Sequence, residues 1–356
     1  MTGEFLNVLL VEDEESNINA WTDAVDTHNV DFEHKGFTIK WENAKSLITA
    51  KERLATNQYD AVIVDLRLQR DIGSSGHNDD GNALVKELIA TKPVGIVVYS
   101  GQPAEAEYYA CSQVTVIDRA AGLPPVFDWL GTHKNMFFAL GRAKLVLDEQ
   151  TAQLFYKAIW PRWKYWAEEG DAKAIGKMLA RHISSHVHDS LLNESNGTTH
   201  PEESYFVPPI KDRLDTGDLI KLEDETVWVV VTPRCDLAHE NKTDTVLIAQ
   251  CKDISIEWSG LITGEASKTK DEKIKKLKKH GDSFKQHFLP PMKDNAGKAL
   301  GPWMVQFHHL QSHLATKAKA NFTQKRFSTI SPHFVPSLVE RFGAYFSRIG
   351  TPDIEE

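Results

Sequence analysis

The chain has 356 residues, which at roughly 150 residues per domain predicts about two domains. Its 41% hydrophobic and 26% charged residues are ordinary for globular proteins and exclude a fibrous or wholly disordered chain. The net charge of −9 is concentrated near the start, because residues 1–122 hold 20 of the 50 acidic residues but only 10 of the 41 basic ones. Such an acidic surface is unsuited to non-specific DNA binding, so we do not expect a nucleic-acid partner, although the composition does not exclude one.

The sequence also constrains the compartment. Apolar runs such as residues 227–231 are far shorter than the about 20 residues that cross a bilayer. The first seven residues lack the basic start and long apolar run of a signal peptide. Three cysteines are too few, and odd in number, for a disulfide framework, which favours a reducing compartment. We therefore expect a cytoplasmic protein with no membrane partner.

Strand and helix signals alternate through the first third of the chain. Apolar, β-rich runs occur at residues 5–11, 37–41, 61–64, 94–99 and 114–117, and stretches with helical spacing occur at 16–26, 44–56 and 83–90. Continuous apolar strands separated by amphipathic helices are typical of a parallel sheet that is covered on both faces. We therefore predict an α/β domain over residues 1–122, with a five-stranded parallel sheet whose strands all end at one edge.

The rest of the chain changes character. Residues 123–200 are mostly helical and rich in aromatic residues, and we expect this connector to pack into a core or a dimer interface. Residues 201–356 mix strands, notably in 218–250, with helices such as one opened by Ser331 and Pro332. We predict an α+β domain here, and its short strands with tight turns suggest a small β-barrel.

Acidic and hydroxyl side chains follow the predicted strands of the first domain. Glu12 and Asp13 follow the first strand, Asp65 follows the third, and Ser100 follows the fourth. These strand ends meet at one edge, where three carboxylates would repel each other. A divalent cation relieves that repulsion, and oxygen ligands favour Mg²⁺. A carboxylate beside Mg²⁺ can attack an activated phosphoryl group, whose oxygens Ser100 can then hydrogen-bond.

Four short pieces of sequence occur in order in this region: V-L-L-V-E-D at 8–13, V-I-V-D-L at 62–66, D-G-x-x-L-V at 80–85 and V-V-Y-S-G at 97–101. Together they resemble a response-regulator receiver domain of two-component signalling, which has a flavodoxin-like α/β fold. The resemblance covers about a third of the chain. It implies that Asp65 is the phosphoacceptor and that Ser100 contacts the phosphoryl group. It also implies Mg²⁺ ligands from Glu12, Asp13, Asp65 and the backbone carbonyl of Arg67.

The sequence departs from the receiver pattern in three places. The family usually has a lysine after the fifth strand, whereas Arg119 is the nearby cation here; arginine can pair with phosphate but is not equivalent to lysine. The aromatic switch residue usual in the fifth strand is absent from residues 114–117. The loop between Asp65 and Gly81 is longer than usual, and we expect it to shield the pocket or to bind a partner.

A possible thiol site stands out in the last domain. Cys235, Asp236 and His239 follow the buried strand at 227–231. Such a thiol could act as a nucleophile, or bind a metal together with Cys251. A cysteine packed in a core is the simpler interpretation.

Other clusters have simpler structural interpretations. The groups His182, His186, Asp189 and His308, His309, His313 have spacings that can hold a metal, although structural histidines explain them as well. Residues 268–285 contain eight lysines and can attract an acidic partner, but they lack the interleaved aromatic residues that stack on bases. We expect a solvated helix there.

We therefore predict a phosphorelay response regulator that accepts a phosphoryl group on Asp65 from a histidine kinase or phosphotransfer protein. Its C-terminal output domain has no helix-turn-helix signal, and homodimerisation through residues 123–140 is one route to output. Enzymatic activity beyond phosphotransfer and autodephosphorylation stays open. Two alternatives remain: a receiver-gated effector enzyme, such as a nuclease or hydrolase using Cys235 and His239, and a scaffold that works without phosphorylation.

Overall fold

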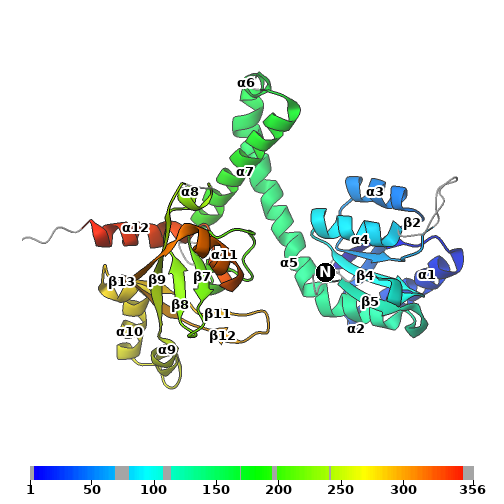
Figure 1. Ribbon diagram of the computed structural model, residues 1–356. Coiled ribbons are helices and arrows are strands. Elements are labelled where there is room, and N and C mark those ends of the chain that lie inside the picture. The colour runs from blue at the N-terminus through cyan, green and yellow to red at the C-terminus, as the bar shows by residue number, and fades with distance from the viewer. Residues whose placement is uncertain are drawn as a thin grey trace, which may run out of the picture. The chain divides into compact units, whose positions relative to one another are not determined.

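The computed structural model describes residues 4–68, 80–106, 114–168, 170–194, 199–239 and 242–347. The chain divides into two compact units, an N-terminal unit of residues 1–192 and a C-terminal unit of residues 193–356 (Figure 1). Among the described helices, none combines the length and apolar character needed to cross a bilayer.

The N-terminal unit is built on a five-stranded parallel sheet. In chain order the strands are β1 (Phe5–Val11), β2 (Thr38–Ala44), β3 (Ala61–Val64), β4 (Gly95–Ser100) and β5 (Val114–Asp118). Their spatial order is β2-β1-β3-β4-β5, and every adjacent pair is parallel. This is the strand order of flavodoxin-like doubly wound folds. The predicted α/β class and strand number are therefore confirmed.

Helices cover both faces of this sheet. The longer ones are α1 (Glu15–Val30), α3 (Leu47–Thr56), α4 (Asp80–Thr91) and α5 (Pro124–Leu154), and the short turns are α2 (Phe32–Lys35), η1 (Pro103–Glu105) and η2 (Arg119–Ala121). Residues of α1 and α5 share one buried cluster with the sheet, and residues of α3 and α4 share the other. Because both faces are buried, alternate residues of β1 enter opposite clusters, and the strand is apolar apart from Asn7.

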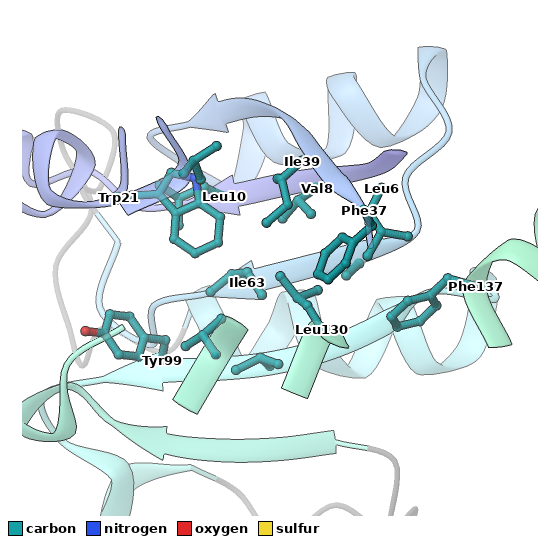
Figure 2. Packing of buried hydrophobic residues seen from close by; sticks show 14 of the residues in the cluster. Leu6, Val8, Leu10, Trp21, Phe37, Ile39, Ile63, Tyr99, Leu130 and Phe137 are labelled. Carbon is teal, nitrogen blue, oxygen red and sulfur yellow. The ribbon is translucent and has the colours of Figure 1, made fainter. Parts of the chain in front are cut away.

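The first half of α5 belongs to the core of the N-terminal unit. Figure 2 shows Leu130 and Phe137 of α5 beside the sheet residues Leu6 and Ile63. All four side chains are at most 2% exposed. The core therefore includes residues well beyond 122, where the sequence suggests the receiver ends.

The second half of α5 continues past the sheet into a helical hairpin. At 1.5 Å per residue, its 31 residues extend over about 46 Å. The hairpin continues through η3 (Phe155–Ile159), η4 (Trp160–Arg162), α6 (Trp163–Ala167) and α7 (Ala172–Glu194). Tyr156 and Trp160 are 70% and 66% exposed. Packing of the connector's aromatic residues into a core is therefore seen near the sheet, and the exposed rings of the hairpin leave the dimer-interface alternative untested there.

The C-terminal unit contains a seven-stranded antiparallel sheet in the order β10-β13-β9-β8-β7-β14-β6. The strands are β6 (Tyr205–Phe206), β7 (Asp218–Lys221), β8 (Val227–Val230), β9 (Thr245–Asp253), β10 (Gln286–Leu289), β13 (Trp303–Leu314) and β14 (Arg326–Ile330), beside a hairpin of β11 (Met292–Lys293) and β12 (Ala299–Leu300). The sheet is curled like half a barrel, and within the described residues its end strands do not pair with each other (Figure 1). The predicted α+β class is confirmed.

Helices pack on both sides of this curled sheet. They are α8 (Arg234–Leu237), α9 (Ser255–Ile262), α10 (Lys268–Lys278), α11 (Ala315–Lys325) and α12 (Val335–Phe346), with the short turns η5 (Pro201–Ser204) and η6 (His280–Asp282). Val335 and Leu338 of α12 enter the cluster on one face, and Ala318 and Phe322 of α11 enter the cluster on the other. The C-terminal unit thus has its own core.

Candidate functional site

The parallel sheet brings the predicted acidic residues together. Glu12 and Asp13 directly follow β1, and Asp65 directly follows β3. One carboxylate oxygen from each of the three lies within 4.8 Å of the others. Ser100 is the last residue of β4, and Arg119 comes directly after β5. Four strand ends therefore supply the side chains at this edge.

Burial makes the pKa values of the carboxyl groups in the acidic cluster sensitive to nearby charges. Glu12 is 3% exposed and Asp65 is 8% exposed. Burial raises the pKa of the Glu12 and Asp13 carboxyls above their usual values, and the charge of Asp65 raises it further. The backbone N–H groups of Asp13 and Glu14 donate to Glu12 Oε1, at 3.1 and 2.9 Å. These hydrogen bonds favour the ionised form and oppose part of the effect of burial.

Arg119 supplies a cation inside the cluster. Its Nη2 lies 2.7 Å from Glu12 Oε2 and 3.1 Å from Asp65 Oδ2, so one guanidinium bridges two strand ends. Three carboxylates and one guanidinium leave a formal charge of −2, which a divalent cation would balance. Sequence spacing places Arg119 near the site but does not predict these two ion pairs.

The donor set fits a magnesium ion. Adjacent oxygens around octahedral Mg²⁺ lie about 3 Å apart and opposite ones about 4.2 Å apart, because the bonds are about 2.1 Å long. The spread of up to 4.8 Å among Glu12, Asp13 and Asp65 is close to those values, and all three donors are hard oxygens. A guanidinium has no lone pair to offer a metal ion, so the backbone carbonyl is the only candidate ligand of Arg67. Its side chain forms a bidentate ion pair with Glu105, at 2.6 and 3.1 Å.

Two further residues support the site. A Cβ atom on Gly81 would lie 2.4 Å from the carbonyl oxygen of Asp65, so only glycine permits this close approach of α4 to the backbone that follows β3. Tyr99 places its ring 5.7 Å from the Arg119 guanidinium, and its hydroxyl donates to the Arg119 carbonyl at 3.5 Å. Both residues lie in the quoted motifs, but the motifs do not reveal these contacts. Residues 69–79 of the long loop are outside the described residues.

The possible thiol site is not assembled among the described residues of the C-terminal unit, and the simpler interpretation of a cysteine packed in a core is wrong for Cys235 and holds for Cys251. Cys235 is exposed and its thiol donates to Asp236 at 3.4 Å, while Lys319 contacts the backbone carbonyl of His239. Cys251 lies buried in the core, where burial raises the pKa of its thiol far above the usual value. None of the hydrogen bonds of the described residues joins Cys235 to His239.

Structural roles explain the histidine clusters and the lysine-rich helix. His182 packs on Trp166, and His313 packs on Phe322. Among the described side chains, the acidic cluster at Asp65 alone brings three potential metal ligands close together. The lysines of α10 other than the half-buried Lys270 are exposed, as expected for a solvated helix.

No protein-family model matches the chain, and no curated protein sequence matches it. Among solved structures, a CheY-like receiver domain from Methylobacillus flagellatus is 27% identical and aligns over 36% of this chain and 99% of that chain, with a TM-score of 0.25. A response regulator from Thermotoga maritima, in complex with Mg²⁺ and BeF, is 18% identical over 36% and 97% of the two chains, with a TM-score of 0.25. RcsB of Salmonella enterica serovar Typhimurium, bound to a promoter in the presence of BeF₃⁻, is 15% identical over 55% and 93%, again at 0.25.

Proposed function

We propose that the protein is a response regulator in which Asp65 accepts a phosphoryl group and the C-terminal unit carries the output. The observation that supports this proposal best is the gathering of three carboxylates, Arg119 and the buried Ser100 at the ends of parallel strands. A cytoplasmic histidine kinase or phosphotransfer protein would be the donor. Bound Mg²⁺ would supply positive charge that offsets the repulsion between the carboxylates and the incoming phosphoryl oxygens.

The transfer requires little chemistry from the protein beyond positioning. A carboxylate oxygen of Asp65 would form the new bond to phosphorus while the P–N bond of the donor phosphohistidine breaks, and the leaving imidazole keeps that electron pair and takes up a proton. The guanidinium of Arg119 already lies 3.1 Å from Asp65 Oδ2, and its planar donors suit phosphoryl oxygens. The hydroxyl of Ser100, which accepts the Gln102 N–H at 3.3 Å, is a second candidate partner.

Phosphorylation would change the contacts of Arg119. A phosphoryl group adds about −1.5 to −2 charges at pH 7. Arg119 would then divide its hydrogen bonds between that group and Glu12, which it contacts now. Because η2 containing Arg119 leads within a few residues into α5, a shift there would be transmitted to the helix and to the ring of Tyr99 beside the guanidinium.

Incubation of the full chain with acetyl phosphate and Mg²⁺ tests the proposal. We expect the intact mass to increase by one phosphoryl group, and we expect Asp65→Asn to abolish that increase because the amide cannot accept the group. Asp118→Asn is the matched control, since Asp118 lies beside Arg119 but is exposed and caps η2 through the Ala120 N–H. Equal labelling of Asp65→Asn and the unaltered chain would refute the proposal.

An exposed apolar stripe on α5 is the proposed route to a homodimer. Met136, Leu140, Ala143 and Leu147 follow one another at spacings of four, three and four residues, as in a coiled-coil seam, and the three large ones are 48%, 38% and 44% exposed. In a parallel pair of helices each of these residues would meet its own copy. We expect Leu147→Glu to lower the molar mass measured by light scattering from dimer to monomer. A wild-type chain that is monomeric both with and without beryllofluoride would contradict this route.

The ion pairs of Arg119 also favour a second candidate, a scaffold that works without phosphorylation. In this alternative Arg119 takes the place of a metal ion and permanently links Glu12 to Asp65. The acetyl phosphate experiment separates the two candidates, because the scaffold predicts no mass increase in the unaltered chain.

A further inference from the structure

A cavity of about 360 Å³ lies within the C-terminal unit. Its walls come from η5, β10, the end of α10 and the start of α12 (α10 and α12 are labelled in Figure 1). Ligand pockets in proteins typically measure about 300–1,000 Å³ and combine apolar walls with a few polar groups. The size of this cavity falls within that range.

Two stacked histidines supply polar groups on one wall. The rings of His280 and His287 lie 4.5 Å apart with an angle of 22° between their planes. The Nδ1 atom of His280 accepts the backbone N–H of Phe288 at 3.0 Å, so its Nε2 carries the proton and remains a donor. His287 is 5% exposed, and its Nδ1 has no hydrogen-bond partner among the described residues. A buried imidazole therefore has unused hydrogen-bonding capacity beside the cavity.

The electrostatic surroundings of the cavity are positive. Lys278 lines it, and none of the described residues that line it is an aspartate or a glutamate. Arg341 lies beside the histidines and donates to the carbonyls of Ser283 and Gln286, at 2.6 and 2.9 Å, and none of its contacts within the described part of the chain is with a carboxylate. Burial, aided by the charge of Arg341, lowers the pKa of His280 to about 4 and that of His287 to about 3. Both rings are thus neutral at pH 7, and the positive charge near the cavity comes from Lys278 and Arg341.

The remaining wall is apolar and partly aromatic. It is formed by Phe288, Leu289, Ile330 and Phe334, with Ser204 and Ser337 adding hydroxyl groups. Flat apolar groups pack well against such side chains. An anion without an apolar body would leave this wall in contact with water.

We propose that this cavity is a binding site for a small organic anion with a flat, apolar body. The anionic group would lie toward Lys278, the flat body would lie against Phe334 and Leu289, and the imidazoles would give hydrogen bonds. The site does not involve Asp65. Ligand binding there would give the C-terminal unit a regulatory signal separate from phosphorylation.

The test uses the anionic dye 1-anilinonaphthalene-8-sulfonate and its uncharged relative N-phenyl-1-naphthylamine, titrated into the full chain at pH 7. We expect saturable fluorescence enhancement with the anion and weaker binding of the uncharged dye. Ser337→Trp should abolish the saturable component, because Ser337 is an exposed residue at the cavity where a large ring would fill the space. Lys278→Gln should weaken anion binding several-fold, whereas Lys276→Gln, on the same helix but outside the cavity lining, should not.

Thermal unfolding of each variant checks that its fold is intact. If the saturable signal survives Ser337→Trp, the dye binds elsewhere, for example on exposed Trp160, and the proposal is overturned. It is equally overturned if Lys278→Gln and Lys276→Gln bind the anion alike, or if the uncharged dye binds as tightly as the anion.

Discussion

Replacing Arg119 by alanine is expected to destabilise the N-terminal unit by about 3 kcal/mol in the absence of divalent metal, because removing one partner of a buried ion pair typically costs 3–5 kcal/mol. We expect a cost at the lower end of this range because the Arg119 side chain is 23% exposed. Glu12, whose side chain is 3% exposed, would lose its ion-pair partner at 2.7 Å. The same change removes the cation that competes with Mg²⁺ for Glu12 and Asp65. We therefore expect Mg²⁺ affinity to rise about tenfold, which corresponds to about 1.4 kcal/mol.

Urea unfolding in EDTA and in Mg²⁺, together with calorimetric titration of Mg²⁺, measures both effects. Arg119→Lys is the control, because lysine keeps the positive charge and should lose less stability. If Arg119→Ala is as stable as the unaltered chain in EDTA and binds Mg²⁺ no more tightly, the guanidinium does not act as the internal cation of this pocket.

Replacing Phe137 by alanine is expected to cost about 3–5 kcal/mol of unfolding free energy, as is typical for a buried phenylalanine. The ring is 2% exposed and packs against Trp129, with ring centroids 5.8 Å apart. It also fills the space that Gly95 leaves at the start of β4, since a Cβ there would lie 2.6 Å from the ring. The large cost would follow from the role of α5 as a wall of the core of the N-terminal unit.

Chemical unfolding of the full chain, followed by tryptophan fluorescence, measures this cost. Tyr156→Ala is the control, because Tyr156 is 70% exposed and its removal should change stability little. A fragment ending at residue 122 should fail to fold, and one ending at residue 140 should fold. A stably folded fragment of residues 4–122 would show that α5 is dispensable for the core.

The fold of the N-terminal unit was predictable because the sequence patterns that specify its strands and helices are local. Buried parallel strands such as Ala61–Val64 are apolar throughout, and parallel order fixes where they end. The juxtaposition of Glu12, Asp13 and Asp65 follows from that order, and the structure places their oxygens within 4.8 Å.

Other features were less accessible to sequence reasoning because they depend on side-chain direction and on long-range packing. Nothing in the spacing shows that Arg119 bridges Glu12 and Asp65, or that Gly81 must lack a side chain so that α4 can approach Asp65. The change in sequence character after residue 122 indicates a domain boundary, although the core continues to Phe137. The cavity at His287 is formed by segments distant in sequence and has no motif.

The most direct test of the central claim is ¹⁹F NMR of the full chain with beryllofluoride, a mimic of the phosphoryl group. We predict a bound ¹⁹F signal in the presence of Mg²⁺ that disappears when EDTA is added and is absent from Asp65→Asn. No bound signal in Mg²⁺, or a bound signal that persists in Asp65→Asn, would contradict the assignment of Asp65 as a Mg²⁺-dependent phosphoacceptor.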